Sequence, residues 1–290
     1  MRRSLALTLA AAGILAAAAL LGQTAPAGAV RVVAAPRVAG EAAEQSANWS
    51  GYAATAGTST FNDVTGTWKI PTATCTIGQE SSAAVWVGLG GYAPNSQYLE
   101  QTGSSSDCTA NGKPSYYIWY ELVEPTPTNA SVTVKLKVNP GDTVTSSVVA
   151  TTGTILVQVK DRTRKTSFTK KLPMATPDLS SAEWIVEAPS ECGQGGFCKV
   201  IPLTNFGTVT FTRVAAQTGG VGGTLSMNPG WTLTDIELVP QAHHYFGDPE
   251  NGQGSTGAGG ASPTTPTPDG TSFTVNYSAD AAATAPSATD

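Results

Sequence analysis

Two glutamates, Glu183 and Glu187, occupy alternate positions of the run Ser181–Pro189. Alternate side chains of an extended strand share a face, so these two carboxyl groups lie on one side and an apolar row lies on the other. Trp, Ile and Val in the run favour a strand, and Pro189 ends it because proline cannot donate to a sheet. Paired carboxyl groups are suited to general acid–base chemistry, but glutamates on a half-exposed strand are also ordinary surface residues. The run alone leaves both interpretations open.

Two further predicted strands carry polar groups of the same kind. The strand Tyr98–Gly103 contains Gln101, and the strand Tyr117–Glu121 ends in Glu121. A glutamine can donate through its NH₂ group and accept through its carbonyl oxygen, which suits it to binding an oxyanion or a water. Its ordinary interpretation is a surface glutamine at a strand end.

The sequence lacks the residues that other catalytic mechanisms need. The only histidines, His243 and His244, are adjacent and lie near no G-x-S-x-G or other nucleophile motif, so we interpret them as surface residues. The H-E-x-x-H zinc motif and the P-loop are absent. A hydrolase built on this sequence takes its general acid and base from carboxyl groups, with help from amides. We expect no metal and no cofactor.

The elements that must position these groups are strands. Short alternating runs, punctuated by Gly, Pro, Asn and Thr, recur through the chain, as in Ser131–Val138 and Thr208–Arg213, with no helical period longer than a turn. We therefore predict one all-β domain over residues 47–278, an antiparallel two-sheet β-sandwich of the jelly-roll or concanavalin-like type. A chain of this size can bury a substantial core.

The N-terminus predicts export. A basic start, an apolar run over 5–21 and small residues ending at Ala29 are typical of a cleaved signal peptide over residues 1–29. A membrane anchor is the alternative, but the apolar run is short. Residues 30–46 are a short pro-segment or a disordered N-terminus. We expect a secreted, extracellular protein without a membrane anchor, and a monomer.

The C-terminal part has linker composition. Residues 247–271 are nearly all Gly, Ser, Thr, Pro and Asp, which predicts a flexible loop. Strand alternation returns at 272–277. Because a lone strand is unstable outside a sheet, we favour a long loop that feeds a last strand into the domain over a disordered tail. Residues 279–290 are predicted to be a disordered tail.

Charge is sparse. Only 13% of residues are charged and the net charge is -5, so polarity comes from Ser, Thr, Asn and Gln. Nucleic-acid binding would require clustered Lys and Arg, so we expect no nucleic-acid partner. Few charges also leave little repulsion to develop in acid, which is compatible with stability at low pH.

The four cysteines are expected to form disulfides in an exported chain. Cys192 and Cys198 flank a Gly-rich turn, which favours their pairing and leaves Cys75 with Cys108. A zinc site built from all four thiolates is the alternative, but the spacings include no C-x2-C pair.

Three groups of residues together resemble the glutamic peptidase (eqolisin) family of secreted acid endopeptidases, in a bacterial, actinobacterial-like form. The first is Asn48-Trp49-Ser50-Gly51-Tyr52. The second is Val85–Gly91 followed by Leu99-Glu100-Gln101-Thr102-Gly103, and the third is Trp119-Tyr120-Glu121 with the later Ala182–Glu187. The resemblance covers residues 48–277, and it rests on the order and spacing of all these motifs.

The resemblance implies a sandwich of two seven-stranded antiparallel sheets with the catalytic pair, Gln101 and Glu187, in the groove of a concave sheet. It implies that Trp49, Trp86, Trp119 and Glu121 line this groove and bind substrate. The implied substrates are proteins and peptides, and the implied reaction is hydrolysis by an activated water, without a metal or an acyl-enzyme. The choice of Glu187 over Glu183 rests on the resemblance alone.

The sequence also departs from the family pattern. Fungal members carry an acid at the position of Gly90, an aromatic at Val123 and an apolar residue at Glu100, which leaves subsites and pH range open. Two other functions remain as alternatives. A jelly-roll glycoside hydrolase would use Glu121 and Glu187 as its carboxyl pair. A lectin-like sandwich would use the three tryptophans as a binding strip.

Overall fold

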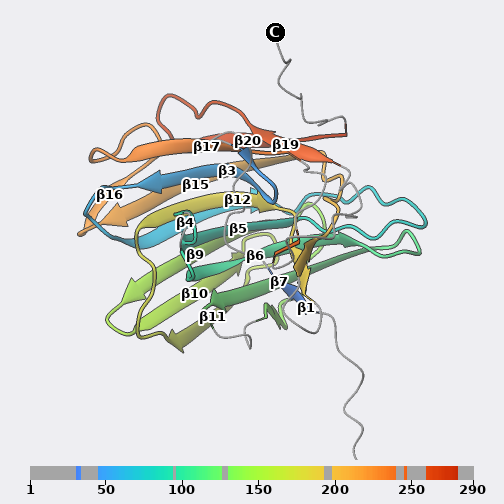
Figure 1. The fold of residues 1–290 in the computed structure, drawn as a ribbon, viewed down its shortest axis with the longest axis horizontal. Coiled ribbons are helices and arrows are strands. Elements are labelled where there is room, and N and C mark those ends of the chain that lie inside the picture. The colour runs from blue at the N-terminus through green and yellow to red at the C-terminus, as the bar shows by residue number, and fades with distance from the viewer. Residues whose placement is uncertain are drawn as a thin grey trace, which may run out of the picture.

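The computed structural model describes residues 31–33, 45–93, 96–125, 130–192, 198–239, 245–246 and 259–279. Every regular element in these ranges is a strand and none is a helix, as the period-two alternation predicts (Figure 1). The all-β prediction is therefore confirmed.

A 16-stranded sheet holds most of the strands, and its hydrogen-bonded path has two halves. The first half follows the order β11-β10-β9-β4-β15-β20-β19. The second half continues as β17-β3-β12-β5-β6-β7-β8. The bounds of the first half are Thr166–Pro173 (β11), Thr154–Asp161 (β10), Thr143–Thr151 (β9), Phe61–Lys69 (β4), Thr208–Thr218 (β15), Ser272–Ser278 (β20) and Gly260–Pro263 (β19). Those of the second half are Thr232–Leu238 (β17), Trp49–Thr55 (β3), Ser181–Glu187 (β12), Ala84–Gly90 (β5), Leu99–Cys108 (β6), Pro114–Val123 (β7) and Val132–Val134 (β8).

Short strands complete the described fold. β2 (Gln45–Ser46) pairs in parallel with β17, and β16 (Val221–Gly223) pairs with β15. A separate four-stranded sheet has the order β1-β13-β14-β18, with bounds Arg31–Val33, Ser190–Cys192, Cys198–Val200 and Tyr245–Phe246. Its strand β13 begins three residues after Glu187, the last residue of β12.

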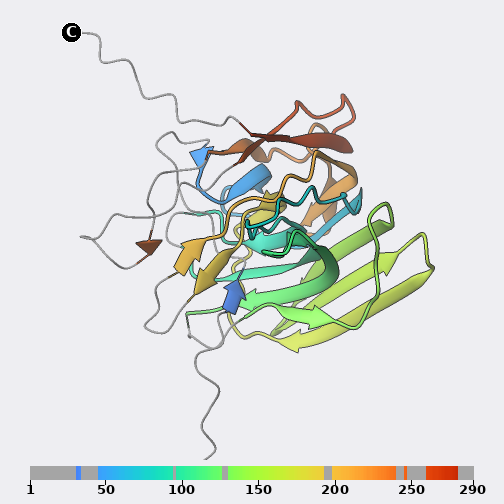
Figure 2. The same ribbon diagram turned by 90° about the vertical axis from the view of Figure 1, so that its right-hand side faces the viewer.

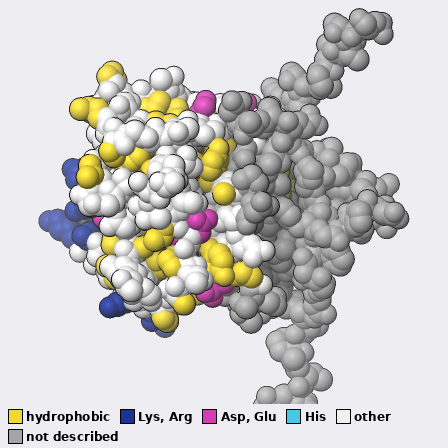
Figure 3. Space-filling view, turned by 60° about the vertical axis from the view of Figure 1, so that its left-hand side comes forward, with side chains coloured by type: hydrophobic (Ala, Val, Ile, Leu, Met, Phe, Trp, Pro, Cys, Tyr) yellow, Lys and Arg dark blue, Asp and Glu magenta, His cyan; other side chains and the backbone are white. Residues whose placement is uncertain are grey.

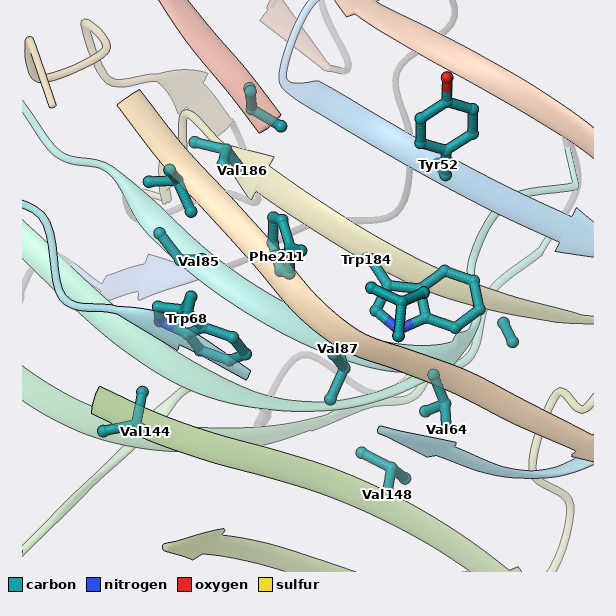
Figure 4. Close-up of a cluster of buried hydrophobic side chains, with 14 of the residues drawn as sticks. Tyr52, Val64, Trp68, Val85, Val87, Val144, Val148, Trp184, Val186 and Phe211 are labelled. Carbon is teal, nitrogen blue, oxygen red and sulfur yellow. The ribbon is translucent and has the colours of Figure 1, made fainter. Parts of the chain in front are cut away.

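The two halves of the large sheet pack on each other, with β4 against β5 and β12, and β9 against β5 and β6 (Figure 2). Between them lies the main core, which is rich in valine and contains the buried rings of Trp68, Trp184 and Phe211 (Figure 4). Trp184 Nε1 donates to Thr65 O at 2.8 Å, which satisfies the indole inside the core. Hydrogen bonding nevertheless continues between the halves, because β17 pairs with both β19 and β3.

A second buried cluster lies on the opposite face of β3, β12, β5, β6 and β7. We call this surface the tryptophan face, because it carries Trp49, Trp86 and Trp119. The alternation predicted for β12 explains the division: Ala182, Trp184 and Val186 belong to the main core, and Ile185 belongs to the tryptophan face.

The segment predicted as a flexible loop is partly regular. Within its described part, Gly260–Pro263 forms β19, and Thr267 Oγ1 donates to Asp269 Oδ1 at 2.6 Å in a tight turn. The composition of this segment favours a flexible loop, because Thr and Asp are typical of linkers. In this turn, however, their side chains form hydrogen bonds that hold the turn in place. β20 follows and pairs with β15 and β19, so the last predicted strand lies inside the sheet.

One predicted disulfide is present: Cys75 is bonded to Cys108. The backbones of Cys192 and Cys198 are direct neighbours across β13 and β14. Their side chains lie outside the described residues, so the second disulfide stays a prediction.

Other sequence predictions also fall outside the described residues. These are the signal peptide 1–29, most of the segment 30–46, the two histidines and the tail from 280 onward. In the described residues no helix is long and apolar enough to cross a membrane. Figure 3 shows one face on which most side chains are uncharged, with Lys and Arg gathered at one edge, as the sparse charge predicts.

Candidate active site

The register of five neighbouring strands arranges the tryptophan face in rows. The first row runs Ala53–Glu183–Gly88–Gln101–Glu121 across β3, β12, β5, β6 and β7. The second runs Gly51–Ile185–Trp86–Gly103–Trp119, and the third runs Trp49–Glu187–Ala84–Ser105–Tyr117. All six residues predicted for the site therefore share one face. Within it, Gln101 is level with Glu183, and Glu187 lies two rows away.

Glu187 is fully buried and accepts hydrogen bonds on both carboxyl oxygens. Trp86 Nε1 donates to its Oε2 at 2.8 Å, and Asn48 Nδ2 donates to its Oε1 at 3.4 Å. Hydrogen bonds from neutral donors stabilise the charged form of a carboxyl group. The surroundings of Glu187 therefore support a carboxylate.

Asn48 is itself held by its neighbours in the chain. Ser46 Oγ donates to Asn48 Oδ1 at 3.0 Å and accepts from the backbone N–H groups of Asn48 and Trp49. This fixes the amide so that its NH₂ group faces Glu187. The Asn48-Trp49 motif thus contributes a donor to the site as well as a ring.

Trp86 connects the row of Gln101 with the row of Glu187. A Cβ atom added at Gly88 would lie 2.8 Å from Trp86 Cζ3, so the six-membered ring covers Gly88 in the first row. The N–H of the same indole reaches Glu187 in the third row. Trp49 packs edge-on against Trp86, with ring centroids 5.0 Å apart and planes at 77°. The two rings fix the surface between Gln101 and Glu187.

The position after Gln101 and Thr102 has no room for a side chain, which explains the glycine at residue 103. A Cβ there would collide with Val85 O and would lie 2.7 Å from Trp86 Cβ. The missing side chain lets the backbone of β5 at Val85 and Trp86 lie close to β6. Thr102 is fixed on the other face, where its Oγ1 donates to Trp119 O at 2.7 Å.

Glu183 has the opposite environment to Glu187. It is fully buried, and in the described part of the chain its carboxyl oxygens have no hydrogen-bond partner. Burial raises its pKa well above the ordinary value, nearby Ser181 partly opposes this, and the carboxyl groups of Asp178 and Glu100 raise it further. Glu183 is therefore neutral in acid, and it is a poor general base.

Glu100 and Asp178 complete a buried acidic group beside Glu183. Burial raises the pKa of Glu100 to about 9, and its Oε1 accepts from the backbone N of Asp178 at 3.3 Å. The carboxylate of Asp178 accepts from Gly91 N and from Ser96 Oγ. The pKa of Asp178 is lowered because these and the Ser180 hydrogen bonds outweigh its partial burial.

Asp178 is the member of this acidic group that sequence reasoning missed. It lies in the loop before β12 and packs on Gly90: a Cβ at Gly90 would lie 2.6 Å from Asp178 Cβ and 2.9 Å from its Cγ. Gly90 has φ +79°, which also favours glycine. In this chain the carboxyl group of Asp178, from the loop before β12, therefore lies beside Gly90. No local motif marks Asp178.

The described residues contain no group of three or more His, Cys, Asp or Glu side chains placed to hold a metal ion. What the site offers is a hydrogen-bonded carboxylate and a carboxamide on one face, with tryptophan rings between their rows.

Comparisons with known proteins find related sequences and structures. Residues 47–243 match the profile of the Peptidase A4 family. Aspergillopepsin-2 from Aspergillus niger is 32% identical over 146 residues, which is 49% of this chain and 48% of that protein. The chain thus spans about half the length of this curated relative in the match.

Solved structures share the fold. The crystal structure of scytalido-glutamic peptidase with a transition state analog inhibitor superposes with a TM-score of 0.60 at 20% identity, covering 80% of this chain and 98% of that one. SCP-B, a member of the Eqolisin family of peptidases in complex with the tripeptide Ala-Ile-His, gives a TM-score of 0.58 at the same identity and coverage. Together with the profile match over most of the domain, these findings show that the chain belongs to the Peptidase A4 family, the family of the glutamic peptidases.

Proposed function

We propose that this protein is a secreted, acid-acting glutamic endopeptidase in which Glu187 and Gln101 hydrolyse peptide bonds of protein substrates. The observation that carries the proposal is the contrast between the two strand glutamates. Glu187 accepts two hydrogen bonds that stabilise its charged form, whereas Glu183 has none and lies near two other acids. Of the two, Glu187 is therefore the one suited to act as a base in acid.

The reaction begins with Glu187 as a carboxylate. It takes a proton from a water, and the resulting hydroxide attacks the carbonyl carbon of the scissile bond. The C–O bond forms as the carbonyl electrons move to oxygen, which gives a tetrahedral oxyanion. Protonated Glu187 then gives its proton to the leaving amine as the C–N bond breaks. An ordinary glutamate titrates at about pH 4.3, so such a base is still ionised in moderately acidic solution.

Gln101 acts on the other side of the carbonyl group. Its NH₂ group donates to the oxyanion, and its carbonyl oxygen can hold the attacking water. The two-row offset between Gln101 and Glu187 suits this division of roles. Base, water, carbonyl carbon and donor follow a bent path, because the water attacks the carbon at a wide angle to the C=O bond, so an amide beside the oxyanion can also reach the water. The residues therefore need to flank the substrate and need not touch each other.

The register also bears on the glycoside hydrolase alternative. A retaining enzyme needs its two carboxyl groups about 5 Å apart. Glu121 lies three strands and four residues from Glu187, which is about 19 Å between Cα atoms in a flat sheet. This separation disfavours Glu121 and Glu187 as the carboxyl pair of a retaining glycosidase.

The remaining features form part of the same proposal. We infer that the two packed halves are the two sheets of a sandwich, with the tryptophan face as its concave groove. The predicted signal peptide and the Cys75–Cys108 disulfide support an extracellular location, and we infer a monomer without a membrane anchor.

Residues 30–46 are inferred to be a pro-segment. Strand β1, within that segment, pairs with β13 just after the catalytic strand, and Gln101 and Glu187 have no exposed surface. A substrate can reach them only after a rearrangement. A chain that starts at residue 45 keeps Ser46 beside Asn48 and should be active at once in acid, whereas the longer chain should become active only after a lag.

The experiment that tests the function is an assay of the purified secreted protein at pH 3–6 on a denatured protein and on a panel of polysaccharides. Cleavage of the protein alone is the expected result. Cleavage of a polysaccharide alone would support the glycoside hydrolase, and binding without cleavage would support the lectin-like alternative.

A further inference from the structure

The tryptophan face continues for one more row beyond Glu187. Two residues along from the row of Ala84, Ser105 and Tyr117 lie Ser82, Asp107 and Ser115. Two strand residues correspond to about 7 Å. A side chain of a substrate held at Glu187 can therefore reach this row.

A cavity of about 380 Å³ opens at this row. Its lining includes Glu80, Ser82, Asp107, Ser115, Glu191 and Lys199. Ligand pockets of proteins begin at about 300 Å³, so the volume is sufficient for one long side chain and a few waters.

Asp107 is fixed in this cavity by donors to both of its oxygens. Ser82 Oγ donates to Oδ1 at 2.5 Å, and the hydroxyl of Tyr117 donates to Oδ2 at 2.7 Å. Ser105 and the backbone N–H of Ala83 also interact with this carboxyl group, so it is held firmly and attracts a ligand by its negative charge. Tyr117 is also packed against the cluster of the tryptophan face, which links the cavity to the proposed site.

The charge of the lining is negative. Glu191 and Lys199 are direct neighbours across β13 and β14, so their charges offset each other. Glu80 and Asp107 are left without an opposing charge among the lining residues that are described. A group that carries a positive charge and several N–H donors complements this arrangement.

We propose that this cavity is a substrate subsite that selects a lysine or arginine side chain within a few residues of the scissile bond. The proposal rests on the peptidase function, and it adds the class of residue that the groove prefers. Asp107 and Glu80 bind the cationic head group, and the wall next to Tyr117 contacts the aliphatic stem.

The pH dependence of this preference follows from the groups that face Asp107. Ser82, Ser105, Tyr117 and Ser115 are neutral, and Glu80, Glu191 and Lys199 are the charged residues nearby. Burial raises the pKa of Asp107, and its hydrogen bonds with Ser82, Tyr117 and Ser105 oppose that shift in part. The preference for a basic side chain should therefore grow as the pH rises from 3 to 6.

The test is a series of peptides with a single cleaved bond, in which each flanking position carries Lys, Arg, Leu or Glu in turn. We expect one position at which Lys and Arg give a kcat/KM about tenfold or more above Leu, the size of a hydrogen bond to a charged group. Asp107→Asn and Glu80→Gln should each reduce that ratio severalfold, chiefly by lowering kcat/KM for the Lys and Arg peptides. Lys199→Gln should increase the ratio.

Glu80 is exposed, so Glu80→Gln keeps the test decisive if Asp107→Asn does not fold. Glu237→Gln, an exposed change on β17 outside the cavity, is the matched control. It should leave the ratio of kcat/KM between the Lys or Arg peptides and the Leu peptide unaltered. Cleavage of the Leu peptides with no preference for Lys or Arg, or a preference unchanged in the variants, would overturn the subsite alone. Failure to cleave any peptide would overturn the peptidase function and the subsite with it.

Discussion

The indole N–H of Trp86 donates a 2.8 Å hydrogen bond to Glu187 while the far ring of the same indole covers Gly88, in the row of Gln101. One side chain therefore fixes the carboxylate and forms the surface between the two residues of the proposed pair. Three strands, β12, β5 and β6, must keep their register for this contact to exist.

Trp86→Phe keeps most of the ring and removes the donor. A hydrogen bond to a charged group is worth about 1.5–3 kcal/mol, so kcat/KM should fall about tenfold to a hundredfold. Without the donor the carboxylate is less stable, so the acidic limb of the pH–rate profile should move to higher pH. Steady-state kinetics from pH 2 to 7 measures both effects. Trp184→Phe, which removes a donor in the main core, is the control: it should lower stability and leave the profile in place.

The contribution of Glu100 and Glu183 to stability should be most favourable in acid and should fall as the pH rises. Burial raises the pKa of Glu100 to about 9 and that of Glu183 well above its ordinary value, so the folded state favours their neutral forms. Below the unfolded value of about 4.5 both states are protonated and no penalty exists. Above it, the unfolded chain releases a proton that folded Glu100 keeps. Each such residue then costs about 1.4 kcal/mol per pH unit until the folded pKa is reached.

Urea unfolding between pH 3 and pH 9 measures this slope. Glu100→Gln and Glu183→Gln should each flatten it and leave stability at pH 3 nearly unchanged. A slope that is the same in the wild type and in both variants would show that these carboxyl groups ionise freely in the folded protein.

The disulfide Cys75–Cys108 closes a loop with a sequence separation of 33. Loss of loop-closure entropy on this scale is worth about 3–4 kcal/mol, so Cys75→Ala with Cys108→Ala should lower the free energy of unfolding by about that amount. Mapping of unreduced peptides should also recover a Cys192–Cys198 bridge. Bridges between the two pairs, or free thiols, would contradict the predicted pairing.

Gly103→Ala tests why the glycine after Thr102 is required. The new methyl group would collide with Val85 O and displace Trp86, so we expect loss of at least about 1–3 kcal/mol of stability together with most activity. Gly207→Ala is a control of the opposite kind: its added Cβ meets nothing within 4 Å, but its φ of +66° gives backbone strain alone. If Gly103→Ala behaved like Gly207→Ala, the close packing of Trp86 on β6 would not matter for the site.

The sequence predicts the parts of this protein that depend on local pattern. Alternation of Ala182, Trp184 and Val186 with Glu183, Ile185 and Glu187 correctly assigns the two faces of β12. It cannot separate Glu183 from Glu187, because both lie on the same face. The difference arises from Trp86, 101 residues away in sequence, and from Asn48, 139 residues away.

Contacts formed only in the folded chain also explain which features could not be predicted from the sequence. Asp178 lies in a loop without a motif, and only the folding of β12 against β5 brings it onto Gly90. The turn at 267–271 reads as linker from its composition, whereas its hydrogen bonds depend on the neighbouring strands β19 and β20.

The measurement that tests the central claim most directly is proteolysis at acidic pH by Glu187→Gln, Gln101→Ala, the double variant and Glu183→Gln. Glu187→Gln should lose nearly all activity because it keeps the shape and removes the base. Gln101→Ala should lose about 10²–10³ in rate, as for one oxyanion donor, and the double variant should lose little more than Glu187→Gln because the residues act as a unit. Glu183→Gln, a neutral replacement of a neutral carboxyl group, should fold and retain substantial activity. Full activity in Glu187→Gln together with an inactive, folded Glu183→Gln would contradict the assignment of the base.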